Sequence, residues 1–186
     1  DVGFSGAFFH SRAGLVTDYM GEEWFTAMRA ALDAAKERGG FLWLYDEDCW
    51  PSGAAGGRVT ALKDEYRSAT LRAHLLAPGE ALQPQPDSEL RMAYAVQRKD
   101  LRLIKAEQLP EADVNARLDC ERLMLNRHYA AKIFGIWGWQ SYANLLNPEA
   151  VQVFITLTHE AYAAQFGEDF GKHVPGLFTD EPNDFQ

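Results

Sequence analysis

The sequence predicts an α/β fold in which parallel strands alternate with helices, arranged as an open sheet or as a barrel. Two apolar segments, 41–46 and 174–179, are predicted strands that end in adjacent acidic residues followed by a proline. Each of them follows a predicted helix, at 22–38 and at 148–166. A strand, a helix and a second strand in this order form a βαβ unit, whose crossover is right-handed.

The first unit begins with a short strand predicted at 4–10, before the helix at 22–38. The helix is predicted from apolar residues that recur on one stripe, and Gly39 follows its last turn. These apolar residues are Phe25, Met28, Leu32 and Ala35. The strand at 41–46 has no polar alternation, which is typical of a strand that is buried on both faces.

The second unit begins with the helix predicted at 148–166. Asn147 is a favourable N-cap residue and Pro148 a favourable first helical residue, so we expect the helix to start there. One face of this helix carries Val151, Ile155, Thr158 and Tyr162. We expect His159, on the same helix, to be a structural residue.

The middle of the chain has the pattern of β-structure. Alternating, β-branched and aromatic residues favour strands at 66–77, 90–98 and 101–108. Lys99 and Asp100 fit a tight hairpin turn between the last two strands. Residues 127–137 are predicted to form another strand, with a helix as the alternative for their first half. We therefore expect one domain, 1–186, that contains a β-rich insertion at 66–115.

Composition and charge limit the classes of function. Of the 186 residues, 47% are apolar and 24% are charged, as in ordinary globular proteins. The formal net charge of −9 opposes binding to nucleic acids and anionic membranes. Apolar runs are too short to cross a bilayer, so we expect a soluble protein, with the cytoplasm slightly favoured over export. Cys49 and Cys120 form no disulfide framework, and Cys49 has no local histidine to activate it.

Two acidic clusters follow the two apolar strands: Asp46, Glu47 and Asp48 in one, Asp180 and Glu181 in the other. Because the carboxyl ends of parallel strands lie on one side of a sheet, the two clusters are expected to share a cleft. Two carboxylates in one cleft are the minimum equipment for acid/base hydrolysis of an acetal. Two alternatives stay open, namely helix caps or solvated rim residues, and a calcium or magnesium site.

Further residues are candidates for the walls of this cleft. His10 ends the first predicted strand and Arg12 follows it, so both could contact a substrate hydroxyl or carboxylate. Trp50 lies beside the first acidic cluster and offers a flat surface for a sugar ring. Trp139 and Asn144 belong to a segment rich in aromatic residues, for which core packing is the alternative. The glycines after Trp50 lack the Gly-Lys-Ser/Thr ending of a phosphate-binding loop.

Four motifs occur together in one order along the chain. They are GAFFHSRAGLVTDYMGEEWF (6–25), WLYDEDCWPSGAAGG (43–57), LLNPEAVQVFITLTHEAYAAQFG (145–167) and VPGLFTDEP (174–182). The second resembles a Tyr-Asp-Glu-x-x-Trp-Pro-Ser-Gly-x-Ala-Gly-Gly signature. The set resembles bacterial glycoside hydrolases such as the family 106 α-L-rhamnosidases and their uncharacterised relatives. The resemblance covers both ends of the chain and leaves the β-rich middle unaligned.

This resemblance implies a TIM-type (β/α) barrel, of which about four strands with their helices would be present here. It also implies a sugar site at the carboxyl ends of the strands, inverting hydrolysis by two glutamates, and calcium near the sugar. Glu181 becomes the catalytic general acid, and Asp46 and Glu47 become residues that contact the substrate or a metal. Glu47 is also the second candidate for a catalytic role. The substrate-binding residues expected from the resemblance and from the residue pattern are His10, Arg12, Asp46, Trp50, Trp139, Asn144 and Asp180.

The predicted function is hydrolysis of a glycoside, such as an α-L-rhamnoside, with a carbohydrate as substrate and neither nucleic acid nor membrane as partner. A complete barrel needs about 250 residues, so we expect a homodimer or a missing C-terminal half to complete it. Relatives carry an acid where this chain has Asn144, which argues against a metal role for that loop. Two alternatives stay open: a carbohydrate-binding or assembly module without catalysis, and a metal-dependent hydrolase.

Overall fold

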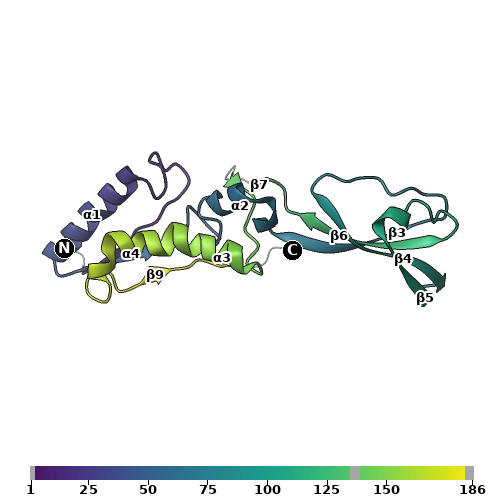
Figure 1. Cartoon of the computed structure of the whole chain (residues 1–186). Helices are drawn as coiled ribbons and strands as arrows, with labels where there is room; N and C mark the ends of the chain where they lie inside the picture. Colours follow the sequence, from purple (N-terminus) through teal and green to yellow (C-terminus); the bar gives the residue numbers. More distant parts are fainter. Residues whose placement is uncertain (1–2, 135–138, 183–186) are drawn as a thin grey trace. The chain divides into compact units, whose positions relative to one another are not determined.

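The computed structural model describes residues 3–134 and 139–182. Their side chains are described as well, except those of residues 133–134 and 139–140. The chain divides into two compact units (Figure 1). We name them after their sheets: of the described residues, the parallel unit contains 3–68, 132–134 and 139–182, and the antiparallel unit contains 69–131.

A three-stranded parallel sheet forms the centre of the parallel unit, in the order β1-β2-β9. Its strands are β1 (Gly6–Phe8), β2 (Phe41–Tyr45) and β9 (Leu177–Phe178). Gly6 pairs with Phe41, and Leu44 pairs with Leu177. The three strands predicted at the two ends of the chain are confirmed as parallel neighbours, although β1 and β9 are shorter than expected.

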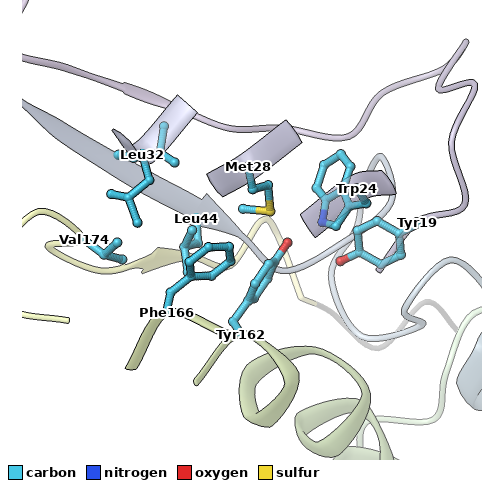
Figure 2. Packing of buried hydrophobic residues seen from close by; sticks show 9 residues of the cluster. Tyr19, Trp24, Met28, Leu32, Leu44, Tyr162, Phe166 and Val174 are labelled. Carbon is cyan, nitrogen blue, oxygen red and sulfur yellow. The ribbon is translucent and has the colours of Figure 1, made fainter. Parts of the chain in front are cut away.

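Helix α1 (Glu22–Glu37) connects β1 to β2 and packs on the sheet (Figure 2). Trp24, Met28 and Leu32 recur every four residues on one face of the helix and are buried in a core with Leu44. Gly39 follows the helix with a φ of 64°, a conformation that glycine adopts without steric cost. The helix predicted at 22–38 is confirmed, with Trp24 rather than Phe25 beginning its buried stripe.

A continuous helical stretch leads from Pro148 to Phe166. It consists of α3 (Pro148–Ile155), the π-helical turn η4 (Thr156–Glu160) and α4 (Ala161–Phe166). The N-cap predicted at Asn147 is confirmed, since its Oδ1 accepts a hydrogen bond from the Glu149 N–H at 3.0 Å. The wider π turn shifts the phase of the helix, so the side chains beyond it are reoriented. Tyr162 and Phe166 enter the core beneath α1 (Figure 2).

Shorter elements complete the parallel unit. They are α2 (Arg58–Leu62), η1 (Asp64–Tyr66), η5 (Gly167–Asp169) and the antiparallel pair β7 (Ile133–Phe134) and β8 (Trp139–Gln140). Val59, Tyr66, Ala143 and Phe154 form a second buried cluster, which holds α2 against α3. This cluster fixes the glycine-rich segment that leads from β2 to α2.

The antiparallel unit is a four-stranded sheet in the order β3-β6-β4-β5. Its elements are β3 (Ala69–Leu76), β4 (Ser88–Lys99), β5 (Arg102–Leu109), the short η2 (Glu111–Asp113) and β6 (Glu121–Tyr129). The predicted hairpin turn is confirmed, since β4 and β5 pair around Asp100, whose φ is 56°. Ala69 pairs with Tyr129, so the chain enters and leaves this sheet at one rung.

The ends of this unit differ from the sequence-based expectation. Of the strand predicted at 127–137, residues 127–129 end β6, which begins at Glu121, residues 133–134 form β7, and 135–137 lie outside the described residues. The helix alternative for the first half of this segment is wrong. The antiparallel unit accordingly continues to residue 131, beyond the insertion expected at 66–115. Its alternating burial from Arg122 to Asn126 is the two-residue period of a strand with one covered face.

The expected partial TIM-type barrel is wrong. Within the described residues the main sheets are separate, one of three parallel strands and one of four antiparallel strands, and no barrel closes. The middle strands satisfy their hydrogen bonds with one another and bury a core of their own, which includes Leu76, Ala93 and Met124.

Candidate functional site

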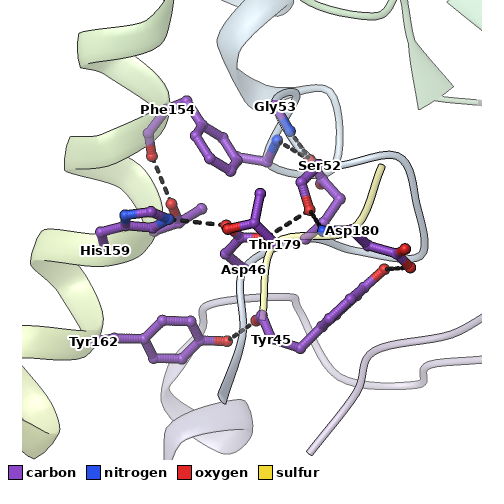
Figure 3. Close-up of polar contacts among 12 residues, drawn as sticks. Tyr45, Asp46, Ser52, Gly53, Phe154, His159, Tyr162, Thr179 and Asp180 are labelled. Atoms are coloured by element: carbon purple, nitrogen blue, oxygen red, sulfur yellow. Dashed lines mark hydrogen bonds and ion pairs between the residues drawn. The ribbon is translucent and has the colours of Figure 1, made fainter. Parts of the chain in front are cut away.

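Asp46, which directly follows β2, is a fully buried carboxylate that joins three parts of the parallel unit (Figure 3). Its Oδ1 accepts a hydrogen bond from Ser52 Oγ at 2.6 Å, and its Oδ2 accepts one from Thr179 Oγ1 at 2.7 Å. His159 Nε2, from the π turn, lies 2.9 Å from the same Oδ2. A buried charge needs such partners, so Asp46 links the ends of β2 and β9 to the helix.

Glu47 is also fully buried and anchors the loop that follows it. Its two oxygens accept hydrogen bonds from the backbone N–H groups of Asp48, Gly53, Ala54, Ala55 and Gly56. Burial raises the pKa of Glu47 to about 7, and the backbone amides oppose this rise. Both carboxylate oxygens of Glu47 accept hydrogen bonds from the loop, so Glu47 fixes the conformation of residues 48–56.

Asp180, Tyr45 and Arg12 form a second polar cluster at the same edge of the sheet. The Tyr45 hydroxyl lies 2.8 Å from Asp180 Oδ2, and Arg12 Nη1 donates to this hydroxyl at 3.0 Å. Arg12 Nη2 lies 3.9 Å from Asp180 Oδ2, with the two side chains 46% and 19% exposed. The Asp180 N–H donates to Ser52 Oγ at 2.9 Å, which connects this cluster to Asp46. The acids after β2 and β9 therefore lie at one edge, as parallel strands require.

Aromatic rings adjoin this polar cluster. The His10 ring stacks on the Tyr45 ring, with centroids 4.0 Å apart and an interplanar angle of 11°. Phe178 stacks on Tyr45 at 5.9 Å, and Phe178 and Trp50 are each 42% exposed. Desolvation and the neighbouring Arg12 lower the pKa of His10, so its ring is neutral at pH 7. The edge thus combines flat apolar surfaces with hydrogen-bonding groups.

The remaining predicted site residues have different surroundings. Glu181 is exposed, and its φ of 45° places a non-glycine residue in the left-handed region, at a cost of about 1–2 kcal/mol. Asn144 supports its own loop, since its Oδ1 accepts the Leu146 N–H at 3.1 Å. Trp139 belongs to β8, and its side chain lies outside the described residues. Of the predicted residues, the structure therefore brings together His10, Arg12 and Asp180, and Ser52 joins Asp46 to Asp180.

The residue pattern did not identify four members of this site: Tyr45, Ser52, His159 and Thr179. Tyr45 and Thr179 directly precede the acidic clusters, so a search for hydroxyl donors beside those acids would find them, whereas Ser52 follows the first cluster after Cys49, Trp50 and Pro51. His159 is different, because it reaches Asp46 from the π turn, and no periodicity in the sequence announces that turn.

The described residues do not fit the calcium ion that the family resemblance implies. Among them, no group of three or more His, Cys, Asp or Glu side chains is arranged to hold a metal. Asp46 and Glu47, the acids best placed for such a role, direct their oxygens at protein donors. Burial and the Asp48 carboxylate raise the pKa of the Cys49 thiol, so Cys49 is not an activated nucleophile.

Over the ranges 3–134 and 139–182, the helices are too short or too polar to cross a membrane. Comparison of the chain with protein-family models, with curated proteins and with solved structures gives no match.

Proposed function

We propose that the parallel unit binds a carbohydrate at the carboxyl ends of β2 and β9 and hydrolyses a glycoside, such as an α-L-rhamnoside. One observation carries the proposal: Arg12, Tyr45 and Asp180 form a hydrogen-bonded cluster directly beside the stacked His10 ring. A sugar presents apolar C–H groups on its faces and hydroxyl groups around its rim. A site for it needs both flat apolar surfaces and polar groups of fixed orientation.

Arg12 and Asp180 are the groups that we assign to the sugar hydroxyls. The guanidinium is a rigid donor, and the carboxylate is an acceptor that Tyr45 and Arg12 hold in place. Phe178 and Trp50 are partly exposed and supply surfaces on which a sugar ring can stack. The net charge of −9 supports a neutral or cationic ligand at this edge and opposes nucleic acid.

Glu181 is the residue that we assign as the general acid. Its carboxyl group is exposed and directly follows Asp180, whereas Asp46 and Glu47 are fully buried and bonded to protein donors. In the reaction Glu181 gives its proton to the leaving oxygen as the bond from that oxygen to the anomeric carbon breaks, and water supplies the new hydroxyl group. The proton that this water releases passes to solvent, and solvent returns a proton to Glu181. The strained backbone of Glu181 and the resemblance of the VPGLFTDEP motif to glycoside hydrolases support this choice.

The test uses Glu181→Gln with a panel of aryl glycosides that includes an α-L-rhamnoside. We expect kcat to fall at least about 100-fold, because proton transfer of this kind contributes 10²–10⁴-fold. Glu168→Gln, at another exposed glutamate of the same unit, is the matched control and should keep full activity. Unchanged turnover in the Glu181 variant would show that this assignment is wrong.

A second candidate function is carbohydrate binding without hydrolysis. It is favoured by the burial of Asp46 and Glu47, which leaves their oxygens bonded to the protein rather than facing a substrate. Calorimetry of the unaltered chain with the same sugars separates the two candidates. Binding of a sugar together with the absence of hydrolysis across the panel would favour the binding module.

A further inference from the structure

The antiparallel unit has two adjoining hollows of about 350 and 360 Å³, and the proposed glycoside site does not involve them. Their size is that of a site for a small molecule. Both hollows are lined by Leu82, Gln83, Gln85 and Asn126, so they share one loop segment and one strand residue. The strand residue is Asn126 of β6, whose side-chain amide is available to a ligand in either hollow.

Asn126 is only 7% exposed, yet its side-chain amide forms no hydrogen bond with any residue that the structure describes. Within the described residues the amide is not among the fully enclosed polar groups without a partner, so it keeps access to solvent and opens into the hollows. Since Asn126 lines both hollows, its amide is directed at whatever occupies them. A carboxamide offers both donors and an acceptor, which suits the hydroxyl groups of a ligand.

Arg72 and two histidines are among the residues that line the larger hollow. Arg72 and His74 lie two residues apart on β3 and therefore on one face of the sheet, and Arg72 is directly opposite Asn126. Neither Arg72 nor His74 forms a hydrogen bond or an ion pair within ranges 3–134 and 139–182. His128, from β6, lies on the same wall, with its Nε2 3.5 Å from Ser88 Oγ.

Acidic side chains also line the hollows, Glu80 the larger one and Glu111 the smaller one, so the two linings together have no excess of positive charge. Glu80 is the acid among the described residues that line the larger hollow, and its Oε2 already accepts the Ala77 N–H at 3.0 Å. The antiparallel unit as a whole contains nine basic and nine acidic residues, so the net charge of −9 belongs to the parallel unit. An anion is therefore not repelled by the unit that carries the hollows.

We propose that these hollows bind a small carboxylated sugar. Arg72 is the donor for the carboxylate, because a guanidinium fork matches the two oxygens of this group. The amides of Asn126, Gln83 and Gln85 are the partners of the sugar hydroxyls, and Leu82 supplies an apolar contact for the C–H groups. This site stands on the antiparallel unit alone and does not depend on the glycoside site.

The test is calorimetric titration of the full chain with D-glucuronate, D-glucose and inorganic phosphate. We expect D-glucuronate to bind more tightly than either of the others, and Arg72→Gln to weaken its binding at least about tenfold. Arg102→Gln removes an exposed arginine of the same unit outside both hollows and should leave binding unchanged. Thermal unfolding of both variants checks that they fold. We expect both to fold, because Arg72 and Arg102 are exposed.

Three results would overturn the proposal. They are the absence of heat with D-glucuronate, an equal loss of affinity in the Arg72 and Arg102 variants, and phosphate or glucose binding as tightly as glucuronate. A second measurement needs no variant: the imidazole NMR signals of His74 and His128 should shift on addition of D-glucuronate and stay in place with D-glucose. Identical spectra with both sugars would equally contradict a carboxylated ligand. The activity of the Glu181 variant has no bearing on these outcomes, so the two proposals fail separately.

Discussion

His159 Nε2 lies 2.9 Å from Oδ2 of Asp46, although 113 positions separate the two residues in the chain. The histidine side chain is 38% exposed and the carboxylate is fully buried, so the pair connects the surface of the π turn to the interior. Figure 3 shows that Ser52 and Thr179 approach the same carboxylate from two other segments. The stability of this junction depends on the charge of Asp46.

Replacement of Asp46 by asparagine should destabilise the chain by about 2–3 kcal/mol. The change keeps the size of the side chain but removes the charge to which three donors are directed, and hydrogen bonds to charged groups are the strong ones. Asp33→Asn, at an exposed position of α1, is the control and should change stability by less than about 0.5 kcal/mol. Urea unfolding measures both, and equal effects would contradict the role given to Asp46.

The pH dependence of stability should carry a contribution from Glu47. Burial raises its pKa from 4.5 to about 7 in the folded chain, so the folded state binds the proton more tightly than the unfolded state does. Its contribution to stability is then fully present below about pH 4.5 and is lost as the pH rises through about 7. At 1.36 kcal/mol for each pKa unit, the loss is on the order of 3 kcal/mol.

The measurement is urea unfolding between pH 4 and pH 8 for the unaltered chain and for Glu47→Gln. Glutamine does not titrate, so the decline attributed to Glu47 should be absent from the variant. The comparison rests on the difference between the two pH profiles, because other groups contribute equally to both. Parallel profiles would show that Glu47 has the same proton affinity in the folded and unfolded chain.

Gly176, just before β9, should be intolerant of a side chain. A Cβ placed there would lie 2.8 Å from Cζ3 of Trp43, closer than such atoms approach in proteins. We expect Gly176→Ala to cost about 1–3 kcal/mol, because the Trp43 ring or the strand pairing must shift. Gly167→Ala is the matched control, since its Cβ would meet no atom within 4 Å, and it should be neutral or stabilising. Denaturant midpoints decide, and a neutral Gly176 variant would contradict the close packing of β9 on Trp43.

Local patterns predicted most of the regular elements. The spacing of Met28 and Leu32, the cap at Asn147 and the turn at Asp100 are short-range signals, and the structure contains each of them. Short-range signals could not show whether the strands form a barrel. Whether strands join one sheet or two depends on pairings between distant segments, such as Ala69 with Tyr129, and no local pattern specifies them.

The candidate site was predictable in position but not in the state of its acids. Acidic residues after two parallel strands do meet at one edge, as Asp46 and Asp180 do through Ser52. The expectation that they face a cleft assumes that contact with solvent is the most favourable way to stabilise a carboxylate. The loop after Glu47 stabilises its carboxylate in another way, since five backbone N–H groups donate hydrogen bonds to it. This arrangement depends on the conformation of the loop, which no local sequence pattern specifies.

The rung that joins Ala69 to Tyr129 has a consequence for the modularity of the chain. Paired residues in an antiparallel ladder have Cα atoms about 4.5–5.5 Å apart. The segment from β3 to β6 therefore begins and ends at two neighbouring positions, the start of β3 and the end of β6. A tight turn of a few residues spans the same gap. A gene could therefore lose, gain or exchange this segment as a cassette, while the parallel sheet kept its connectivity.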